Sequence, residues 1–128
     1  MSTVIRAENI VTRFGKNLVH DGISLAVKRG EIYGLLGGSG SGKSTLMKEM
    51  IMLLRPNSGD LHVLGKNLMT IERQDAASLR EQWGVLFQHG ALYSSLTVKE
   101  NVAIRLKEYT DLPDKLIKDL VRMKINLV

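Results

Sequence analysis

Residues Gly37 to Thr45, GGSGSGKST, constrain the fold of this 128-residue chain more than any other segment. They match the pattern G-x-x-x-x-G-K-(S/T), whose glycines let the main chain curl tightly and turn its N–H groups inward. Such a curl, followed by the N-terminal end of a helix, is typical of a phosphate-binding loop. The pattern therefore requires a buried strand before the loop and a helix after it.

The residues on both sides of the loop meet this requirement. Residues 31–36, EIYGLL, are nearly continuously apolar, which is typical of a strand covered on both faces. After the loop, Leu46, Met50 and Leu53 recur at helical spacing, and the breaking cluster at 55–59 ends this helix. The order strand, loop, helix predicts an α/β protein with a P-loop NTPase fold.

The rest of the chain supplies further expected elements. Strands are predicted at 3–10, 23–28, 60–64 and 83–87, and helices at 73–82, at 97–107 and from 111–114 to the C-terminus. We expect the N-terminal strands to be antiparallel and residues 31–36 and 83–87 to belong to a parallel sheet, with Tyr33 and Trp83 in the core. The last helix carries an apolar stripe formed by Leu116, Leu120, Met123 and Leu127. Such a stripe needs another surface to cover it.

Composition narrows the class of protein. The chain has 44% hydrophobic and 24% charged residues and no cysteine, which indicates a globular domain without disulfides or thiolate metal sites. It has no apolar run of about 20 residues that would span a membrane. The net charge of +5 comes from scattered Lys and Arg, so we expect a solvated surface and no nucleic-acid partner. His20 and His62 lack the spacing of metal ligands, and His89 is expected to be exposed.

The loop predicts a site for ATP with Mg²⁺. The backbone N–H groups wrap the phosphates, and the residues that provide this cradle are Gly37, Gly38, Ser39, Gly40, Ser41 and Gly42. Lys43 brings a full positive charge to the β- and γ-phosphates, and the hydroxyl of Ser44 is placed to coordinate Mg²⁺. Thr45 is a candidate contact to the α-phosphate.

Several further segments resemble the nucleotide-binding domain of ATP-binding-cassette (ABC) ATPases. They are residues 30–32 (GEI), 44–46 (STL), 55–60 (RPNSGD), 85–88 (VLFQ) and 96–102 (LTVKENV), in the order and spacing of that family. The resemblance covers essentially the whole chain. It implies a RecA-like core with an N-terminal antiparallel β subdomain. On this interpretation residues 1–88 reach from the β subdomain and P-loop core to the Q-loop, and residues 89–128 begin a helical subdomain.

The resemblance also implies roles for residues outside the loop. Phe14 stands at the A-loop position and is a candidate to stack on adenine, although an aromatic packed within the N-terminal sheet would look the same in sequence. Val19 could form an apolar edge for the base or belong to the core. Gln88 stands at the Q-loop position, where it would reach Mg²⁺ or the attacking water and act in catalysis together with Lys43.

A narrower resemblance is to the Mla-type ATPases, which energise Mce-protein lipid transporters. It is carried by residues 87–93 (FQHGALY), 100–103 (ENVA) and 106–113 (LKEYTDLP). It implies phospholipid transport between bacterial inner and outer membranes by an ATPase on the cytoplasmic face of the inner membrane. The implied partners are a membrane permease that contacts the Q-loop region, a second ATPase subunit in a homodimer, a small STAS-type regulator and an Mce-type protein.

Other interpretations remain open at this point. The chain could serve an ABC transporter for another cargo, such as an amino acid or a lipoprotein. It could instead be a non-transport ABC protein of DNA repair or translation, although these carry coiled-coil insertions or tandem cassettes. A small-molecule P-loop kinase would need an Arg-bearing lid, and the segment around Gln88 argues against it.

The 128 residues lack three sequence features of the ABC pattern. They contain no LSGGQ-like signature, no apolar strand that ends in Asp-Glu and no switch histidine. We expect these parts to follow Val128 in a longer protein that hydrolyses ATP. The 128 residues themselves are then expected to bind ATP without turning it over, since in-line phosphoryl transfer needs those positioned groups.

Overall fold

The structure is a computed structural model that describes residues 2–128. Along the chain its elements are β1 (Thr3–Phe14), β2 (Asn17–Lys28), α1 (Lys43–Met50), β3 (Ser58–Val63), β4 (Lys66–Asn67), α2 (Arg73–Arg80), α3 (Val98–Tyr109) and α4 (Asp114–Asn126). The chain divides into two compact units, one ending at Gly84 and the other beginning at Val85. The expected functional boundary after Gln88 is a separate matter and stays a prediction.

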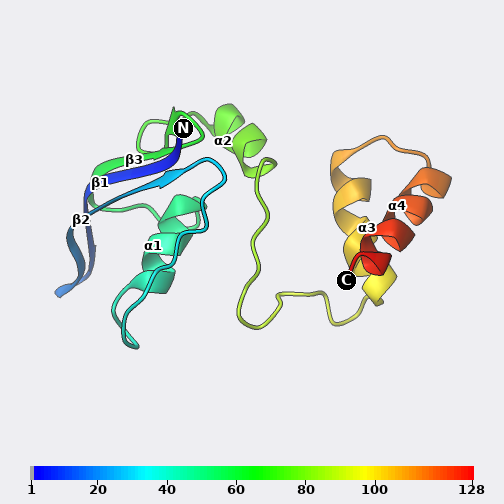
Figure 1. Ribbon diagram of the computed structural model, residues 1–128, viewed down its shortest axis with the longest axis horizontal. Helices are drawn as coiled ribbons and strands as arrows, with labels where there is room; N and C mark the ends of the chain where they lie inside the picture. The colour runs from blue at the N-terminus through cyan, green and yellow to red at the C-terminus, as the bar shows by residue number, and fades with distance from the viewer. Residues whose placement is uncertain (1) are drawn as a thin grey trace. The chain divides into compact units, whose positions relative to one another are not determined.

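The sheet of the first unit is antiparallel. β1 and β2 pair from Thr3 opposite Lys28 to Phe14 opposite Asn17, and Gly15, at a φ of +59°, begins the two-residue turn between them. β3 pairs antiparallel with the other edge of β1, and the strand order is β2-β1-β3-β4 (Figure 1). The antiparallel strands expected of the N-terminal segment are therefore confirmed.

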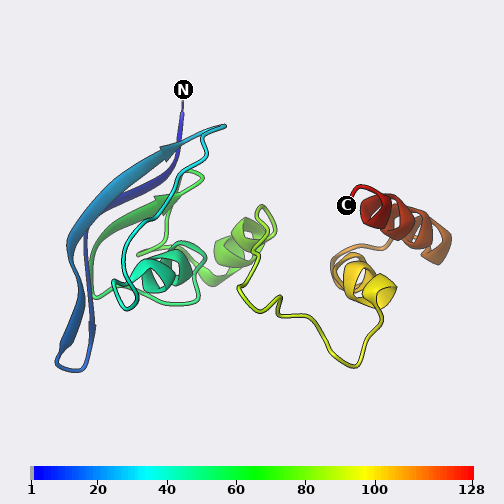
Figure 2. The same cartoon turned by 60° about the horizontal axis from the view of Figure 1, so that its bottom comes forward.

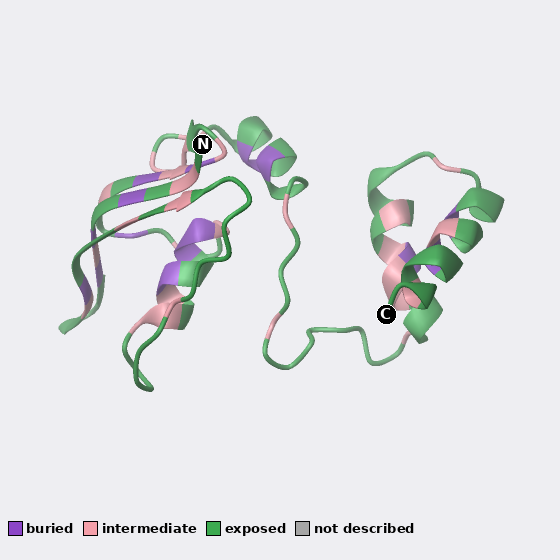
Figure 3. Ribbon diagram, in the orientation of Figure 1, coloured by how far each residue is buried: buried purple, intermediate pink, exposed green. Residues whose placement is uncertain are grey.

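Helix α1 covers one face of this sheet. In two views it lies along the concave side of the curved strands (Figures 1 and 2). The buried residues that join helix and sheet lie on β1, α1 and β3 (Figure 3). They are Ala7, Ile10, Leu46, Met50 and Leu61. Because Leu46 and Met50 are four residues apart, they share one side of α1, as the helical spacing predicts.

The second unit contains a pair of packed helices. α3 begins with a capping box, in which the Thr97 N–H donates to Glu100 Oε2 at 2.7 Å and the Glu100 N–H donates to Thr97 Oγ1 at 3.2 Å. The buried core between α3 and α4 is formed by Ala103, Ile117 and Val121. No helix among residues 2–128 combines the length and apolar character that crossing a bilayer requires.

The apolar stripe predicted for the last helix stays largely uncovered among residues 2–128. Leu116, Met123 and Leu127 are 43%, 48% and 71% exposed, whereas Ile117 and Val121 contact α3. The helix carries two adjacent apolar sides, and α3 covers the one that contains Ile117 and Val121.

The two predicted parallel strands are absent from the described part of the chain. Residues 31–36 and 83–87 belong to no ladder there, and Ile32, Leu36 and Leu86 are exposed. Tyr33, expected in the core, is 45% exposed, and Trp83 is half-buried. An apolar run forms a strand only where a neighbouring strand takes its hydrogen bonds, and the antiparallel sheet offers these segments none.

Candidate functional site

The glycine-rich loop leads directly into α1. Gly42 is the N-cap residue of this helix and has a φ of +91°, and Gly40 has a φ of +77°. Both values lie in the left-handed region that glycine adopts without strain. A Cβ on Gly42 would also lie 2.7 Å from His20 Nε2 and 2.9 Å from Val19 Cγ1. The glycine that the pattern requires at this position is thus required by the structure as well.

Lys43 lies across its own loop. Its ammonium donates to the carbonyl oxygens of Gly37 and Gly38 at 2.6 and 2.7 Å, and it contacts Ser41 Oγ at 3.2 Å. A Cβ on Gly37 would lie 2.7 Å from Ser41 Oγ, so the loop closes tightly on itself. The main chain therefore curls around the ammonium of Lys43, with the carbonyl oxygens of Gly37 and Gly38 turned toward it. The expected cradle of inward N–H groups stays a prediction. Ser39, the remaining loop residue, is exposed.

The N-terminal end of α1 is suited to an anion. Its N-cap residue, Gly42, has no side chain that could cap the helix, and its first turn contains no acidic residue. The first backbone N–H groups of a helix have no partner within the helix, and the helix dipole places partial positive charge there. Lys43, Ser44 and Thr45 occupy this turn, so their N–H groups and the hydroxyls of Ser44 and Thr45 belong to the same electropositive end.

A cavity of about 260 Å³ joins the loop to the β1–β2 hairpin. It is lined by Phe14, Val19 and the residues from Gly40 to Thr45. Phe14 is 50% exposed, so its ring is not packed away in the sheet. The structure thus brings the candidate base-contacting residues Phe14 and Val19 to the same cavity as Lys43. Ser44 is among the residues that line the cavity, and the hydroxyl oxygen of a serine is a ligand type that Mg²⁺ accepts.

Gln88 lies in the second unit. It is exposed and lies within the turn that the Gly90 N–H closes by donating to Phe87 O at 2.9 Å. Its proposed contact with Mg²⁺ or water stays a prediction. His89 is exposed, as expected.

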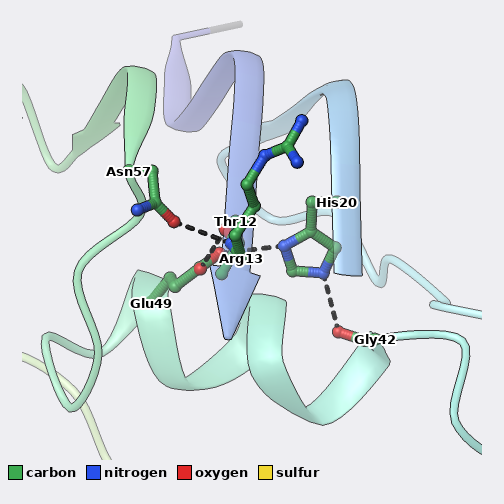
Figure 4. Close-up of polar contacts among 6 residues, drawn as sticks. All are labelled: Thr12, Arg13, His20, Gly42, Glu49 and Asn57. Atoms are coloured by element: carbon green, nitrogen blue, oxygen red, sulfur yellow. Dashed lines mark hydrogen bonds and ion pairs between the residues drawn. The ribbon is translucent and has the colours of Figure 1, made fainter. Parts of the chain in front are cut away.

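A buried polar cluster that no sequence pattern predicted lies beneath the loop. Thr12, His20 and Glu49 are 2%, 3% and 1% exposed, and they lie between the sheet and α1 (Figure 4). One signal for it was available. Glu49 falls on the same side of α1 as Leu46 and Met50, and a charged residue on an apolar helix face requires a buried partner.

One ionisable group has a shifted pKa that the structure explains. Hydrogen bonds from the backbone and then from the side chain of Thr97 lower the pKa of Glu100, because they favour its charged form. This group belongs to the α3 capping box and not to the loop.

Comparison with known proteins relates the chain to transport ATPases. The sequence profile of the family described as "ABC transporter" matches residues 20–127. The "Intermembrane phospholipid transport system ATP-binding protein MlaF" of Haemophilus influenzae is 34% identical over 98% of this chain and 47% of that protein. The "Methionine import ATP-binding protein MetN" of Rhizobium johnstonii is 45% identical over 81% of this chain and 29% of that protein.

Solved structures show the same fold. The ATP-binding cassette MJ0796, in a dimeric post-hydrolysis state bound to ADP and Pi, superposes with a TM-score of 0.81. It covers 93% of this chain and 54% of its own, at 22% identity, so the likeness concerns the fold alone. This confirms the predicted fold class. The chain spans less than half the length of each of these two curated relatives.

Proposed function

Because this chain belongs to the ABC transporter family of ATP-binding proteins, we propose that it binds Mg-ATP at residues 37–45 and serves as the ATPase subunit of a transporter. The observation that carries this proposal is the position of Lys43. Its ammonium is held within the closed loop by two carbonyl oxygens and the Ser41 hydroxyl, next to the positive end of α1. This arrangement concentrates positive charge where a triphosphate would place its negative charge.

Each part of the cavity has a part of the nucleotide to contact. Lys43 would exchange its loop carbonyls for β- and γ-phosphate oxygens, and Thr45 would contact the α-phosphate. Phe14, half-exposed on the cavity wall, would stack on adenine, with Val19 at the edge of the base. Ser44 would hold Mg²⁺, which neutralises charge between the phosphates when bound. Gln88 would act on the attacking water in the complete enzyme.

The proposed cargo is phospholipid. It is supported by the identity to the phospholipid-transport protein MlaF along 98% of the chain and by the residues 87–93, FQHGALY. On this proposal the ATPase works as a homodimer at the cytoplasmic face of the inner membrane. A permease would dock on the Q-loop region, and an Mce-type protein and a STAS-type regulator would complete the system.

A second candidate cargo is an amino acid. The methionine-import protein MetN is 45% identical, a higher value, over a shorter share of the chain. Affinity purification of the tagged protein from its native membranes separates the two proposals. Recovery of an Mce-type protein with the permease supports lipid transport, and recovery of a periplasmic amino-acid-binding protein contradicts it.

The nucleotide site is tested by comparing two lysines of α1. We expect Lys43→Ala to weaken Mg-ATP binding at least tenfold, since it removes the charge at the centre of the loop. Lys48→Ala, at an exposed position in the last turn of the same helix, should leave binding unchanged. Isothermal titration calorimetry measures both. Equal affinity of the Lys43→Ala variant and the unsubstituted protein contradicts the proposed function.

A further inference from the structure

A buried chain of polar contacts connects the sheet to the phosphate loop. Thr12 Oγ1, on β1, donates to Glu49 Oε1, on α1, at 2.6 Å (Figure 4). Thr12 is paired across the β1–β2 ladder with His20, so both side chains point from the sheet toward the helix. The carboxylate of Glu49 is therefore fixed from below, with its second oxygen facing His20.

The ring of His20 spans the distance from Glu49 to the loop. Its Nδ1 lies 3.4 Å from Glu49 Oε2, and its Nε2 lies 3.0 Å from the carbonyl oxygen of Gly42. A carbonyl oxygen only accepts hydrogen bonds, so Nε2 carries the hydrogen in this contact. Nδ1 and Oε2 face each other at ion-pair distance, and neither has a hydrogen-bond partner among residues 2–128.

The Gly42 carbonyl is the point at which the loop becomes helix. It also accepts the first main-chain bond of α1, from the Leu46 N–H at 2.9 Å. The peptide group between Gly42 and Lys43 is planar, so directing its oxygen toward His20 directs the Lys43 N–H to the opposite side. That N–H is one of the uncapped donors at the start of α1.

From this geometry we propose that His20 is a positioning residue for the phosphate loop. By holding the Gly42 carbonyl, it fixes the direction of the Lys43 N–H and the entry of the loop into α1. Glu49 and Thr12 in turn hold the ring of His20. The proposal rests on the proposed function, since what is positioned is a phosphate-binding loop.

A general packing role explains this cluster less well than the positioning role does. Three apolar side chains would fill the same space without the desolvation cost of a buried carboxylate and imidazole. Beyond its own members, the cluster contacts the loop, because His20 Nε2 donates to the Gly42 carbonyl oxygen. The fit is close enough that a single methyl group on Gly42 would lie 2.7 Å from His20 Nε2.

The test uses amide side chains of two lengths at position 20. His20→Gln places an N–H donor about where Nε2 lies, whereas His20→Asn ends about where Nδ1 lies and cannot reach Gly42. We expect His20→Gln to bind Mg-ATP within about twofold of the unsubstituted protein. His20→Asn and His20→Leu should bind about tenfold more weakly, as expected for a lost buried hydrogen bond. Thermal unfolding of each variant is measured in parallel, with Lys48→Ala as the control.

Three results would overturn the proposal. The first is equal affinity of the folded Gln and Asn variants. The second is an affinity that simply follows the unfolding temperature across all variants. If neither the Asn nor the Leu variant folds, the ¹³C shift of the Gly42 carbonyl is compared between His20→Gln and the unsubstituted protein. The third contradicting result is then a His20→Gln variant that binds Mg-ATP with unchanged affinity although the ¹³C shift shows that its Gly42 carbonyl has lost the hydrogen bond.

The same measurements distinguish failure of this proposal from failure of the proposed function. If the unsubstituted protein has no affinity for Mg-ATP and Lys43→Ala makes no difference, the nucleotide site itself is disproved and the role of His20 falls with it. If the unsubstituted protein binds and only the predicted order of the position-20 variants fails, the role of His20 alone is disproved.

Discussion

Gly42 shows how one residue links backbone conformation to the site. It has a φ of +91°, it caps α1, and the position that a Cβ would take lies against His20 and Val19. A side chain would be strained by the backbone and would collide with the imidazole. The position therefore tolerates only glycine, for two independent physical reasons.

We predict that Gly42→Ala lowers the free energy of unfolding by about 2 kcal/mol, because alanine disfavours the left-handed region and its methyl group meets His20. It should also weaken Mg-ATP binding. Gly38→Ala is the matched control, since its φ is not positive and an added Cβ meets no atom within 4 Å. Urea denaturation measures the difference. Equal stability of the two variants contradicts the prediction.

Phe14 gives a prediction about the base and not the phosphates. Its ring lines the cavity and is 50% exposed, so Phe14→Ala should cost little stability. We expect ATP affinity to fall about fivefold or more, as stacking on a base is worth about 1 kcal/mol or more. Affinity for tripolyphosphate, which has no base, should not change. A calorimetric titration with each ligand checks this, and an equal loss for both would assign Phe14 to loop structure.

At the residue scale, the sequence predicted the loop well, but it did not predict the buried residues that hold the loop from below. The phosphate loop follows from a pattern in which every position has a local physical reason. His20 belongs to no pattern, and its contact with Gly42 depends on the pairing of β1 with β2 and the placement of α1. Its neighbour Glu49 was the visible signal, because a carboxylate on an apolar helix face must be paired.

At the scale of elements, local signals predicted that the helices form but did not predict the absence of the parallel strands. The end of α1 was also misplaced, since the helix ends at Met50 and not at the breaking cluster 55–59. α2 begins at the predicted Arg73, and α3 begins with the Thr97 cap that its sequence encodes. These features depend on neighbours within one turn of helix. A parallel strand depends on a partner distant in sequence, and residues 31–36 and 83–87 belong to no ladder in the part of the chain described.

Two adjacent residues of α4 test which side of this helix is buried. Ile117 is 4% exposed and packs on α3, whereas Leu116 is 43% exposed. Ile117→Ala should lower the free energy of unfolding of the second unit by about 2–5 kcal/mol, and Leu116→Ala should change it by about 0.5 kcal/mol or less. Helical circular dichroism during urea denaturation follows both. The reverse order would contradict the packing of Ile117 on α3.

The α3 capping box predicts a pH dependence. Because hydrogen bonds from Thr97 lower the pKa of Glu100 in the folded state, the unfolded chain takes up a proton at higher pH than the folded one. The contribution of Glu100 is therefore present above the pKa of the unfolded state and is lost as pH falls through the lowered folded pKa. Glu100→Gln should remove this dependence between about pH 6 and about pH 3. Identical pH profiles of α3 unfolding for both proteins would contradict it.

At the scale of the whole molecule, the chain corresponds to 47% of the length of MlaF and 29% of that of MetN. It carries Lys43 and Ser44 but no signature sequence and no Asp-Glu pair after an apolar strand. We predict that the 128 residues bind Mg-ATP without sustained hydrolysis, because phosphoryl transfer needs positioned groups on both sides of the phosphate. A steady-state phosphate-release assay tests this, with Lys43→Ala as background. Full turnover above that background would refute it.

The contacts of Lys43 bear on which anions the loop retains. Its ammonium already has three oxygen partners within the loop, two of them uncharged carbonyls at 2.6 and 2.7 Å. An incoming oxygen must compete with these neutral acceptors, so its advantage grows with its own negative charge. On the proposed function, weakly charged solutes should gain little from that competition, and the terminal phosphate of a nucleotide should gain most. We therefore expect the loop to select ligands by charge density, and added salt should weaken that selectivity.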